Sequence, residues 1–251
     1  MNNTISVLIA MLISSVAFAA ADEVSFAAND GVQIYGDVYP SADGKDAAII
    51  LLFHQAGSDA RGEYSGIASR LQENGYNVLA IDQRSGGSRF DGVNRTLAEL
   101  ERKDYSYCEV YPDLLAALKF ARESGFNGRL AVWGSSYSAA LVFQLGAENS
   151  DDVDAILGFS PASGTPMADC APTPYLSQIK VPVLALRPQR EFEIESVQKQ
   201  MQQFKALGMQ TYIADPGVHG SSMLNADRVG ASTEAAWAVV LQFLDASLRK
   251  L

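Results

Sequence analysis

The sequence predicts one α/β domain, built on a mostly parallel, twisted sheet with an antiparallel hairpin at its N-terminal end and helices on both faces. Short apolar runs of strand length alternate along the chain with segments of helical period, and this alternation is typical of parallel βαβ units. The runs are apolar at nearly every position, as expected for strands that are buried on both faces of a sheet.

The hairpin is predicted at the start of this domain. Val24–Ala28 and Val32–Tyr39 flank Asp30-Gly31, and an Asp-Gly dipeptide favours a tight turn between two antiparallel strands. The buried strands that follow share a mainly apolar composition: Ala47–Phe53, Asn77–Ile81, Leu130–Trp133, Val153–Phe159, Val181–Leu186 and Thr211–Ala214.

Segments of helical period lie between these strands. Their apolar or small side chains recur on one face, and they span Glu63–Glu73, Tyr111–Arg122, Ser138–Ala147, Ile194–Leu207 and Thr233–Leu248. Pro161–Pro174 departs from the alternation because it is rich in Pro, Ala and Thr, so we expect a short lid above the strand ends. The sequence has no evident linker or internal repeat, and residues 22–251 are expected to form a single domain.

The first stretch of the chain predicts a cleaved secretory signal. Met1–Ala21 has no charged side chain, is almost wholly apolar or small from Ile5 onward, and ends in an Ala-x-Ala site, as signal peptides do. The alternative is an uncleaved membrane anchor. At roughly 17 residues the run is at the lower limit for spanning a bilayer, and no basic stop-transfer residues follow it. We therefore expect an exported protein, periplasmic or secreted, without a stable membrane anchor.

Composition narrows the classes of partner. The formal net charge of −10 argues against nucleic acid or anionic lipid as the main partner, and we expect a monomer that acts on a small molecule. The two histidines lie outside any cluster at zinc-ligand spacing, so no metal or other cofactor is expected. Cys108 and Cys170 predict one disulfide in an exported protein, with two buried free thiols as the alternative.

The segment Gly134–Ser138 predicts a nucleophile. It joins a strand to a helix of small residues, and a serine on such a sharp turn needs small neighbours two positions before and after it. Trp133 and Tyr137 are too large to flank Ser135, and Ser138 should already lie inside the helix. Ser136 has suitable neighbours and is the predicted nucleophile. The alternative is a Gly/Ser-rich turn without catalytic function.

A serine nucleophile needs a base, and the base needs an acid to orient it. In folds with this type of elbow the chain order is serine, acid, histidine, which selects His219, in the loop after the last strand. The acid should follow Val181–Leu186. Glu191 is preferred, with Glu193 as the alternative and Asp215 as a weaker candidate.

The tetrahedral intermediate also needs backbone donors for its oxyanion. One should be the N–H of Tyr137, which directly follows the nucleophile. The second should come from the loop after Ala47–Phe53, where Ala56 is preferred and Gln55 is also possible. His54 is then expected to have a structural role at the base of that loop.

At this point the sequence resembles the α/β-hydrolase superfamily, and within it the smaller dienelactone-hydrolase-like and esterase-like members. Four matches over nearly the whole mature chain carry the resemblance: His54–Gly57 as the oxyanion loop, Asp82–Gly87 as the family's Asp-x-Arg-Gly-x-Gly loop, the elbow at Ser136 and the late His219. Three positions depart from the family pattern by replacing a glycine, namely Gln55, Ser85 and Ser138. The resemblance implies the α/β-hydrolase fold and, since dienelactone hydrolases use a cysteine nucleophile, general ester chemistry rather than that activity.

The expected function is hydrolysis of a carboxylic ester or thioester of a small acyl compound through an acyl-enzyme on Ser136. One alternative is a peptidase or amidase that uses the same triad. Another is a non-catalytic binding protein on the hydrolase scaffold, since this fold hosts many functions.

Overall fold

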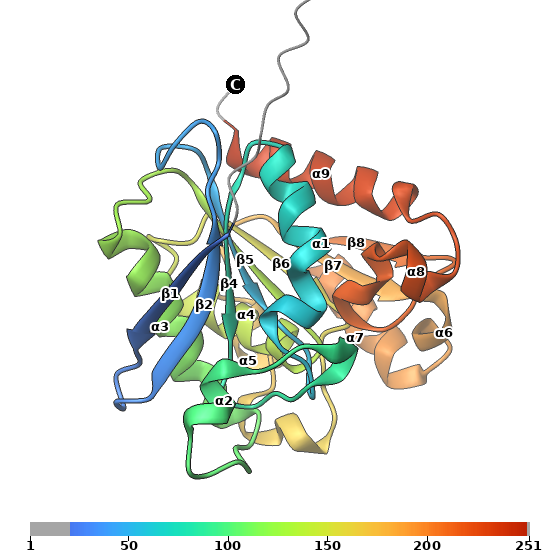
Figure 1. Cartoon of the computed structure of the whole chain (residues 1–251). Helices are drawn as coiled ribbons and strands as arrows, with labels where there is room; N and C mark the ends of the chain where they lie inside the picture. Colours follow the sequence, from blue (N-terminus) through green and yellow to red (C-terminus); the bar gives the residue numbers. More distant parts are fainter. Residues whose placement is uncertain (1–20, 250–251) are drawn as a thin grey trace, which may run out of the picture.

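The computed structural model of the protein describes residues 21–249, so the predicted leader, Met1–Ala21, lies outside the described residues except for Ala21. An eight-stranded sheet crosses the molecule in the order β1-β2-β4-β3-β5-β6-β7-β8 (Figure 1). The strands are β1 (Asp22–Ala27), β2 (Gln33–Tyr39), β3 (Ile49–Phe53), β4 (Asn77–Asp82), β5 (Leu130–Ser135), β6 (Ala155–Phe159), β7 (Val183–Pro188) and β8 (Gln210–Ala214).

The sheet is antiparallel only at its N-terminal side. β1 pairs with β2 and β2 with β4 in antiparallel fashion, whereas β3 to β8 are joined by parallel pairings. The predicted hairpin and all six predicted buried strands are therefore present, with ends that shift by at most two residues. The fold class predicted from the sequence is confirmed.

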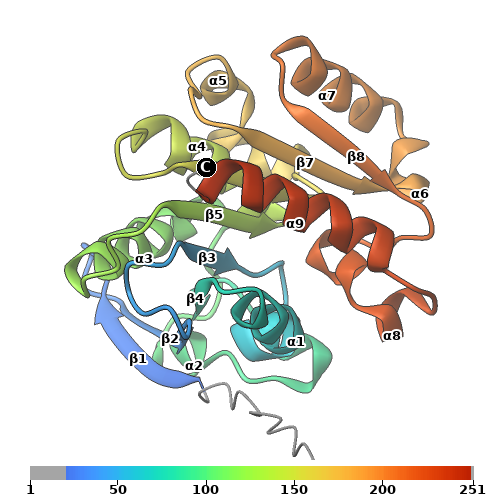
Figure 2. The same cartoon turned by 90° about the horizontal axis from the view of Figure 1, so that it is seen from above.

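Helices cover both faces of the sheet (Figure 2). The five long helices are α1 (Ala60–Glu73), α3 (Tyr111–Glu123), α4 (Tyr137–Glu148), α7 (Glu195–Ala206) and α9 (Glu234–Leu248). Side chains of α1 and α9 pack in one apolar cluster, and those of α3, α4 and α7 pack in a second. β3 shows why its sequence is apolar throughout: Ile49, Leu51 and Phe53 belong to one cluster, and the alternate residues belong to the other.

Short helical turns lie in the connecting loops. Among residues 21–249, four are α-helical, namely α2 (Arg95–Glu99), α5 (Thr173–Leu176), α6 (Gln189–Phe192) and α8 (Ala226–Val229). Four are 3₁₀ turns, namely η1 (Arg89–Asp91), η2 (Cys108–Val110), η3 (Thr165–Cys170) and η4 (Gly220–Leu224). The predicted lid corresponds to η3 and the start of α5, which pack against α4. Within residues 21–249, no helix is both long and apolar enough to cross a membrane.

Candidate active site

The predicted site residues gather at one edge of the sheet. Because β3 to β8 run parallel, their carboxyl ends meet at the same edge, where ligands bind in open α/β sheets. Ala56 follows β3, Ser136 follows β5, Glu191 follows β7 and His219 follows β8. Residues far apart in the sequence therefore share one small region of the molecule.

Ser136 occupies a sharp turn between β5 and α4. Its φ of 60° and ψ of −115° are rare for a residue with a side chain, and such strain clusters at functional sites. Gly134 permits the turn, since a Cβ at this position would lie 2.3 Å from the carbonyl oxygen of Ser138. The chain therefore folds back on itself directly beneath the Ser136 hydroxyl.

The three neighbouring serines differ in exposure and bonding. Ser135 and Ser138 are fully buried, and their hydroxyls donate to Glu63 at 2.7 Å and to the carbonyl of His54 at 2.6 Å. Ser136 is partly exposed, and its hydroxyl has no hydrogen-bond partner among residues 21–249. A serine–histidine hydrogen bond often tightens only when substrate binds. Of the three, only Ser136 presents its hydroxyl to solvent.

Ser138 stands where the family pattern has glycine, and its environment explains the replacement. Besides donating to the carbonyl of His54, its hydroxyl accepts a hydrogen bond from Gln83 Nε2 at 2.6 Å. Gln83 Nε2 also donates to the Tyr137 hydroxyl, which donates in turn to the carbonyl of Ser85. The polar side chain at position 138 is thus satisfied inside a network that links the elbow to the loops after β3 and β4.

His219 and Glu191 are hydrogen-bonded to each other. The distance from His219 Nδ1 to Glu191 Oε1 is 2.6 Å, and because an ionised carboxylate can only accept, Nδ1 carries the hydrogen. The other carboxylate oxygen accepts from Arg187 Nη1 at 2.8 Å. Burial raises the pKa of Glu191, but the hydrogen bonds from His219 and Arg187 outweigh it and lower the pKa to about 2. Glu191 is therefore charged at neutral pH, and Nε2 of His219 is left as the free nitrogen.

The loop that carries His219 is bonded directly to the elbow. The N–H of Ser221 donates to Ser135 Oγ at 2.9 Å, and the N–H of Gly220 donates to Ser160 Oγ at 3.0 Å. These bonds fix the residues that follow His219 against Ser135, which precedes Ser136, and against Ser160, which follows β6. Within residues 21–249, the other candidate acids, Glu193 and Asp215, are exposed and form no ion pair.

The N–H groups of Ala56 and Tyr137 are the predicted oxyanion donors. Tyr137 begins α4, where the first N–H groups of a helix have no partner within the helix. The N–H of Ala56 has no hydrogen-bond partner among the described residues, whereas that of Gln55 donates to Glu63 Oε2 at 2.7 Å. The geometry thus favours Ala56 over Gln55 as the second donor.

His54 is fully buried beneath the loop after β3. Its Nδ1 lies 2.9 Å from the carbonyl of Gln55, and its Nε2 accepts from the N–H of Gln83 at 3.0 Å. Burial lowers the pKa of His54, so the ring is neutral and holds two loops together. These contacts join the loop after β3 to the loop after β4.

Sequence reasoning missed two polar residues that contact the site. Glu63 and Arg187 are 2% and 5% exposed, and they bind the elbow and the acid respectively. Arg187 is the one charged residue of an otherwise apolar strand, β7, and a cation there could have been read as the partner of a nearby carboxylate. Glu63 gave no such signal, because acidic residues are common in the first turn of a helix, where they usually face solvent.

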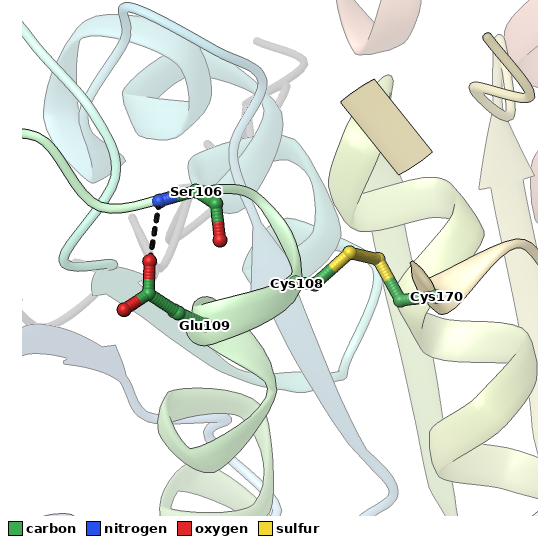
Figure 3. Close-up of a disulfide and its surroundings, with 4 residues drawn as sticks. All are labelled: Ser106, Cys108, Glu109 and Cys170. Carbon is green, nitrogen blue, oxygen red and sulfur yellow. Dashed lines mark hydrogen bonds between the residues drawn. A yellow bond between two sulfur atoms is a disulfide. The ribbon is translucent and has the colours of Figure 1, made fainter. Parts of the chain in front are cut away.

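The structure contains the predicted disulfide between Cys108 and Cys170, whose Cα atoms lie 5.5 Å apart (Figure 3). It joins η2 to η3, so the segment after β6 is tied to the start of α3. The Tyr107 ring stacks on Tyr137 with centroids 4.6 Å apart. Cys108 directly follows Tyr107, so the disulfide lies next to the ring that stacks on Tyr137, the residue after Ser136.

Comparison with solved structures shows the fold. An esterase from Pyrococcus furiosus is 19% identical over 92% of this chain and 93% of its own, with a TM-score of 0.69. A dienelactone hydrolase from Anabaena variabilis is 16% identical over 92% of this chain and 99% of its own, with a TM-score of 0.69. An acylaminoacyl peptidase from Pyrococcus horikoshii is 17% identical over 94% of this chain and 43% of its own, with a TM-score of 0.68.

Sequence comparison adds the family. No curated protein matches the sequence, but residues 44–226, well over half of the chain, match the family described as serine aminopeptidase, S33. The predicted resemblance to the α/β-hydrolase superfamily is thereby confirmed. The chain belongs to the serine aminopeptidase S33 family of α/β-hydrolases.

Proposed function

We propose that the protein is a serine hydrolase that cleaves a carboxylic ester or thioester of a small acyl substrate through an acyl-enzyme on Ser136. The observation that carries the proposal is the hydrogen bond between Glu191 and Nδ1 of His219. It leaves Nε2 free as a base on a loop that is bonded to the elbow of a partly exposed serine. This is the arrangement of roles in a serine–histidine–acid triad.

In the proposed reaction, Nε2 of His219 accepts the Ser136 hydroxyl proton while the serine oxygen attacks the acyl carbon. The imidazolium that forms is stabilised by the charge of Glu191, and it then protonates the leaving alcohol or thiol as the acyl–oxygen or acyl–sulfur bond breaks. Water, activated by the same histidine, releases the acid from Ser136 and restores the hydroxyl.

The N–H groups of Ala56 and Tyr137 are proposed to bind the oxyanion of each tetrahedral intermediate. Both belong to loops held by buried contacts, so little reorganisation is needed as charge develops on the oxygen. The N-terminal end of α4 adds the favourable side of its dipole to the same place.

A second candidate activity is hydrolysis of an aminoacyl amide or peptide bond by the same residues. The description of the family that the chain belongs to, serine aminopeptidase, favours it, and so does the acylaminoacyl peptidase among the structures with the same fold. Purified protein assayed side by side on p-nitrophenyl esters and aminoacyl p-nitroanilides decides between the two. A larger kcat/KM on the anilides supports the peptidase activity.

We further propose that the protein is exported and acts in the periplasm or outside the cell. The Cys108–Cys170 disulfide supports this, because disulfides persist mainly in oxidising compartments. The apolar leader predicted at Met1–Ala21 points the same way.

Replacing the nucleophile tests the function. Ser136→Ala should abolish hydrolysis of p-nitrophenyl acetate and labelling by a fluorophosphonate probe, because both require the same hydroxyl. A fall in kcat of roughly 10⁵-fold or more is expected for the loss of a triad nucleophile. Ser69→Ala removes an exposed hydroxyl on α1 and serves as the matched control, which should retain both activities. If the wild-type protein neither hydrolyses the ester nor takes up the probe, the proposal is wrong, and a binding protein on this scaffold becomes the alternative to test.

A further inference from the structure

The carboxylate of Glu63 is buried directly beneath the candidate site. Glu63 projects from α1, and its side chain is enclosed, with the residue only 2% exposed. Its oxygens accept three hydrogen bonds: from the N–H of Gln55 at 2.7 Å, from Gln55 Nε2 at 3.1 Å and from the Ser135 hydroxyl at 2.7 Å. Two of these donors belong to Gln55, in the loop after β3, and the third belongs to Ser135, the last residue of β5.

The direction of the Ser135 hydrogen bond follows from its other contact. Ser135 Oγ accepts a hydrogen bond from the N–H of Ser221 at 2.9 Å, so its own hydrogen is free to point at Glu63. Because every neighbour of the Glu63 carboxylate is then a donor, the group has no need of a proton of its own. The network fits an ionised Glu63, although burial raises its pKa.

The two residues bonded to Glu63, and Ser221, which donates to Ser135, stand next to the residues that are proposed to act on substrate. Gln55 directly precedes Ala56, Ser135 lies two residues before Tyr137, and Ser221 lies two residues after His219. A Cβ added to Gly220 would lie 3.7 Å from Glu63 Oε1. The loop that carries His219 therefore also lies against the Glu63 carboxylate. The Glu63 carboxylate therefore contacts the oxyanion loop and the elbow directly. It is linked to the His219 loop through Ser135, which bonds to both Glu63 and Ser221.

A buried carboxylate is a costly way to stabilise a fold, since apolar residues of similar volume often serve as well or better. Arg228, a neighbouring cation, donates to the backbone carbonyls of Gly62 and Glu63 and to Ser222, but not to the Glu63 carboxylate. The hydrogen bonds of the Glu63 carboxylate therefore come from Gln55 and Ser135, and within the described part of the chain none comes from a cation.

We propose that Glu63 is a positioning residue, whose carboxylate holds the loop of Ala56 and the elbow of Ser136 at the separation that makes the two oxyanion donors converge. The inference rests on the proposed serine-hydrolase function. Glu63 itself does not contact substrate in this proposal. Its effect is on the geometry of two N–H groups that must be held to within roughly half an ångström to act together.

Glu63→Gln tests the proposal because it keeps the side-chain length and replaces one accepting oxygen by an amide nitrogen that cannot accept. We expect kcat/KM for p-nitrophenyl acetate to fall roughly ten- to a hundredfold, the scale associated with a misplaced or missing oxyanion donor, mainly through kcat. The inhibition constant of a trifluoromethyl ketone, which forms a tetrahedral adduct on serine, should rise by a similar factor.

Asp37→Asn is the matched control. It also removes the charge of a buried carboxylate, 1% exposed, but this one lies on β2 and binds Arg61 and Arg95 rather than the site loops. Its kcat/KM should remain within about twofold of the wild-type value, as for a substitution away from the site. Folding of each variant is checked by circular dichroism.

Ser135→Ala removes the hydrogen bond between Glu63 and the elbow, together with the one that Ser135 Oγ accepts from the N–H of Ser221, and it gives a second route if Glu63→Gln does not fold. It should lower kcat/KM in the same direction, by a smaller factor. A folded variant of either kind with wild-type kcat/KM, or with lowered kcat/KM and an unchanged inhibition constant for the ketone, overturns the role of Glu63 and leaves the proposed function intact. Wild-type protein without esterase or amidase activity overturns both.

Discussion

The acid of the candidate triad was the least determined residue in the sequence, because Glu191 and Glu193 lie two positions apart in one charged loop. In the structure, α6 turns Glu191 toward His219, and Glu193 points to solvent. Arg187, four residues earlier, fixes the second oxygen of Glu191. A contact between two loops, rather than any local pattern, separates the two candidates.

Replacing these two glutamates separately should give unequal results. Glu191→Gln should lower kcat roughly 10³- to 10⁴-fold, because His219 loses the partner that fixes its tautomer and stabilises its charged form. Glu193→Gln is the matched control and should change kcat less than about twofold, as for a surface substitution away from the site. Steady-state kinetics on p-nitrophenyl acetate measures both, and equal losses would contradict the assignment of Glu191.

Glu191 should also contribute to stability in a pH-dependent way. Its pKa in the folded protein, about 2, lies below the ordinary value of 4.5, so ionised Glu191 stabilises the fold above the ordinary value. This contribution, on the order of 3 kcal/mol, is lost as the pH falls from about 4.5 toward 2. The difference in free energy of unfolding between wild type and Glu191→Gln, from urea titrations, should shrink over that interval. A difference that does not vary with pH would contradict it.

How much of the site could be predicted depends on the range of the interactions. Ser136 follows from local sterics, and His219 from its place after the last strand. Glu63 could not be predicted, because its bond to Ser135 spans 72 residues and nothing in its own helix indicates a buried carboxylate. The proposed nucleophile and base are thus marked locally, whereas Glu63 is defined only by the tertiary fold.

At the scale of elements, the strands were predictable because burial on both faces leaves a continuous apolar run. The ends of the strands were less predictable. β5 extends to Ser135, two residues beyond the predicted end, because its pairing with β6 continues into the residues of the elbow. Helices such as α6, with four residues, are too short for a period of 3.6 to be detected. Short helices in the loops after the strands therefore escaped prediction, including the one that orients Glu191.

The disulfide should stabilise the connection between η2 and η3. Its cysteines are 62 residues apart, and closing a loop of that length in the unfolded chain contributes roughly 4 kcal/mol. The double variant Cys108→Ser/Cys170→Ser should therefore melt on the order of 10 °C below the wild type. Reductant should lower the wild-type melting temperature toward the same value and leave the variant unchanged. A wild-type melting temperature that is insensitive to full reduction, verified by mass, would contradict this contribution.

At the scale of the whole molecule, the fold distributes the site over both faces and most of the sequence. α1 on one face supplies Glu63, α4 on the other begins at Tyr137, and the loops between contribute Ala56, Glu191 and His219. The sequence was sufficient to assign this architecture, because alternation of strands and helices fixes which strand ends meet. It was not sufficient to give the exact packing of the loops.

The strand order has one more consequence. β1, β2, β4 and β3 occupy one side of the sheet, and β5 to β8 occupy the other, so the seam between β3 and β5 divides the sequence into two contiguous halves. The oxyanion loop and Glu63 lie in the first half, and Ser136, Glu191 and His219 in the second. A backbone break in the exposed stretch 101–104 would produce two fragments with complementary parts of the site. Their reassociation would be reported by the return of catalysis, which makes this scaffold suited to a split-enzyme sensor.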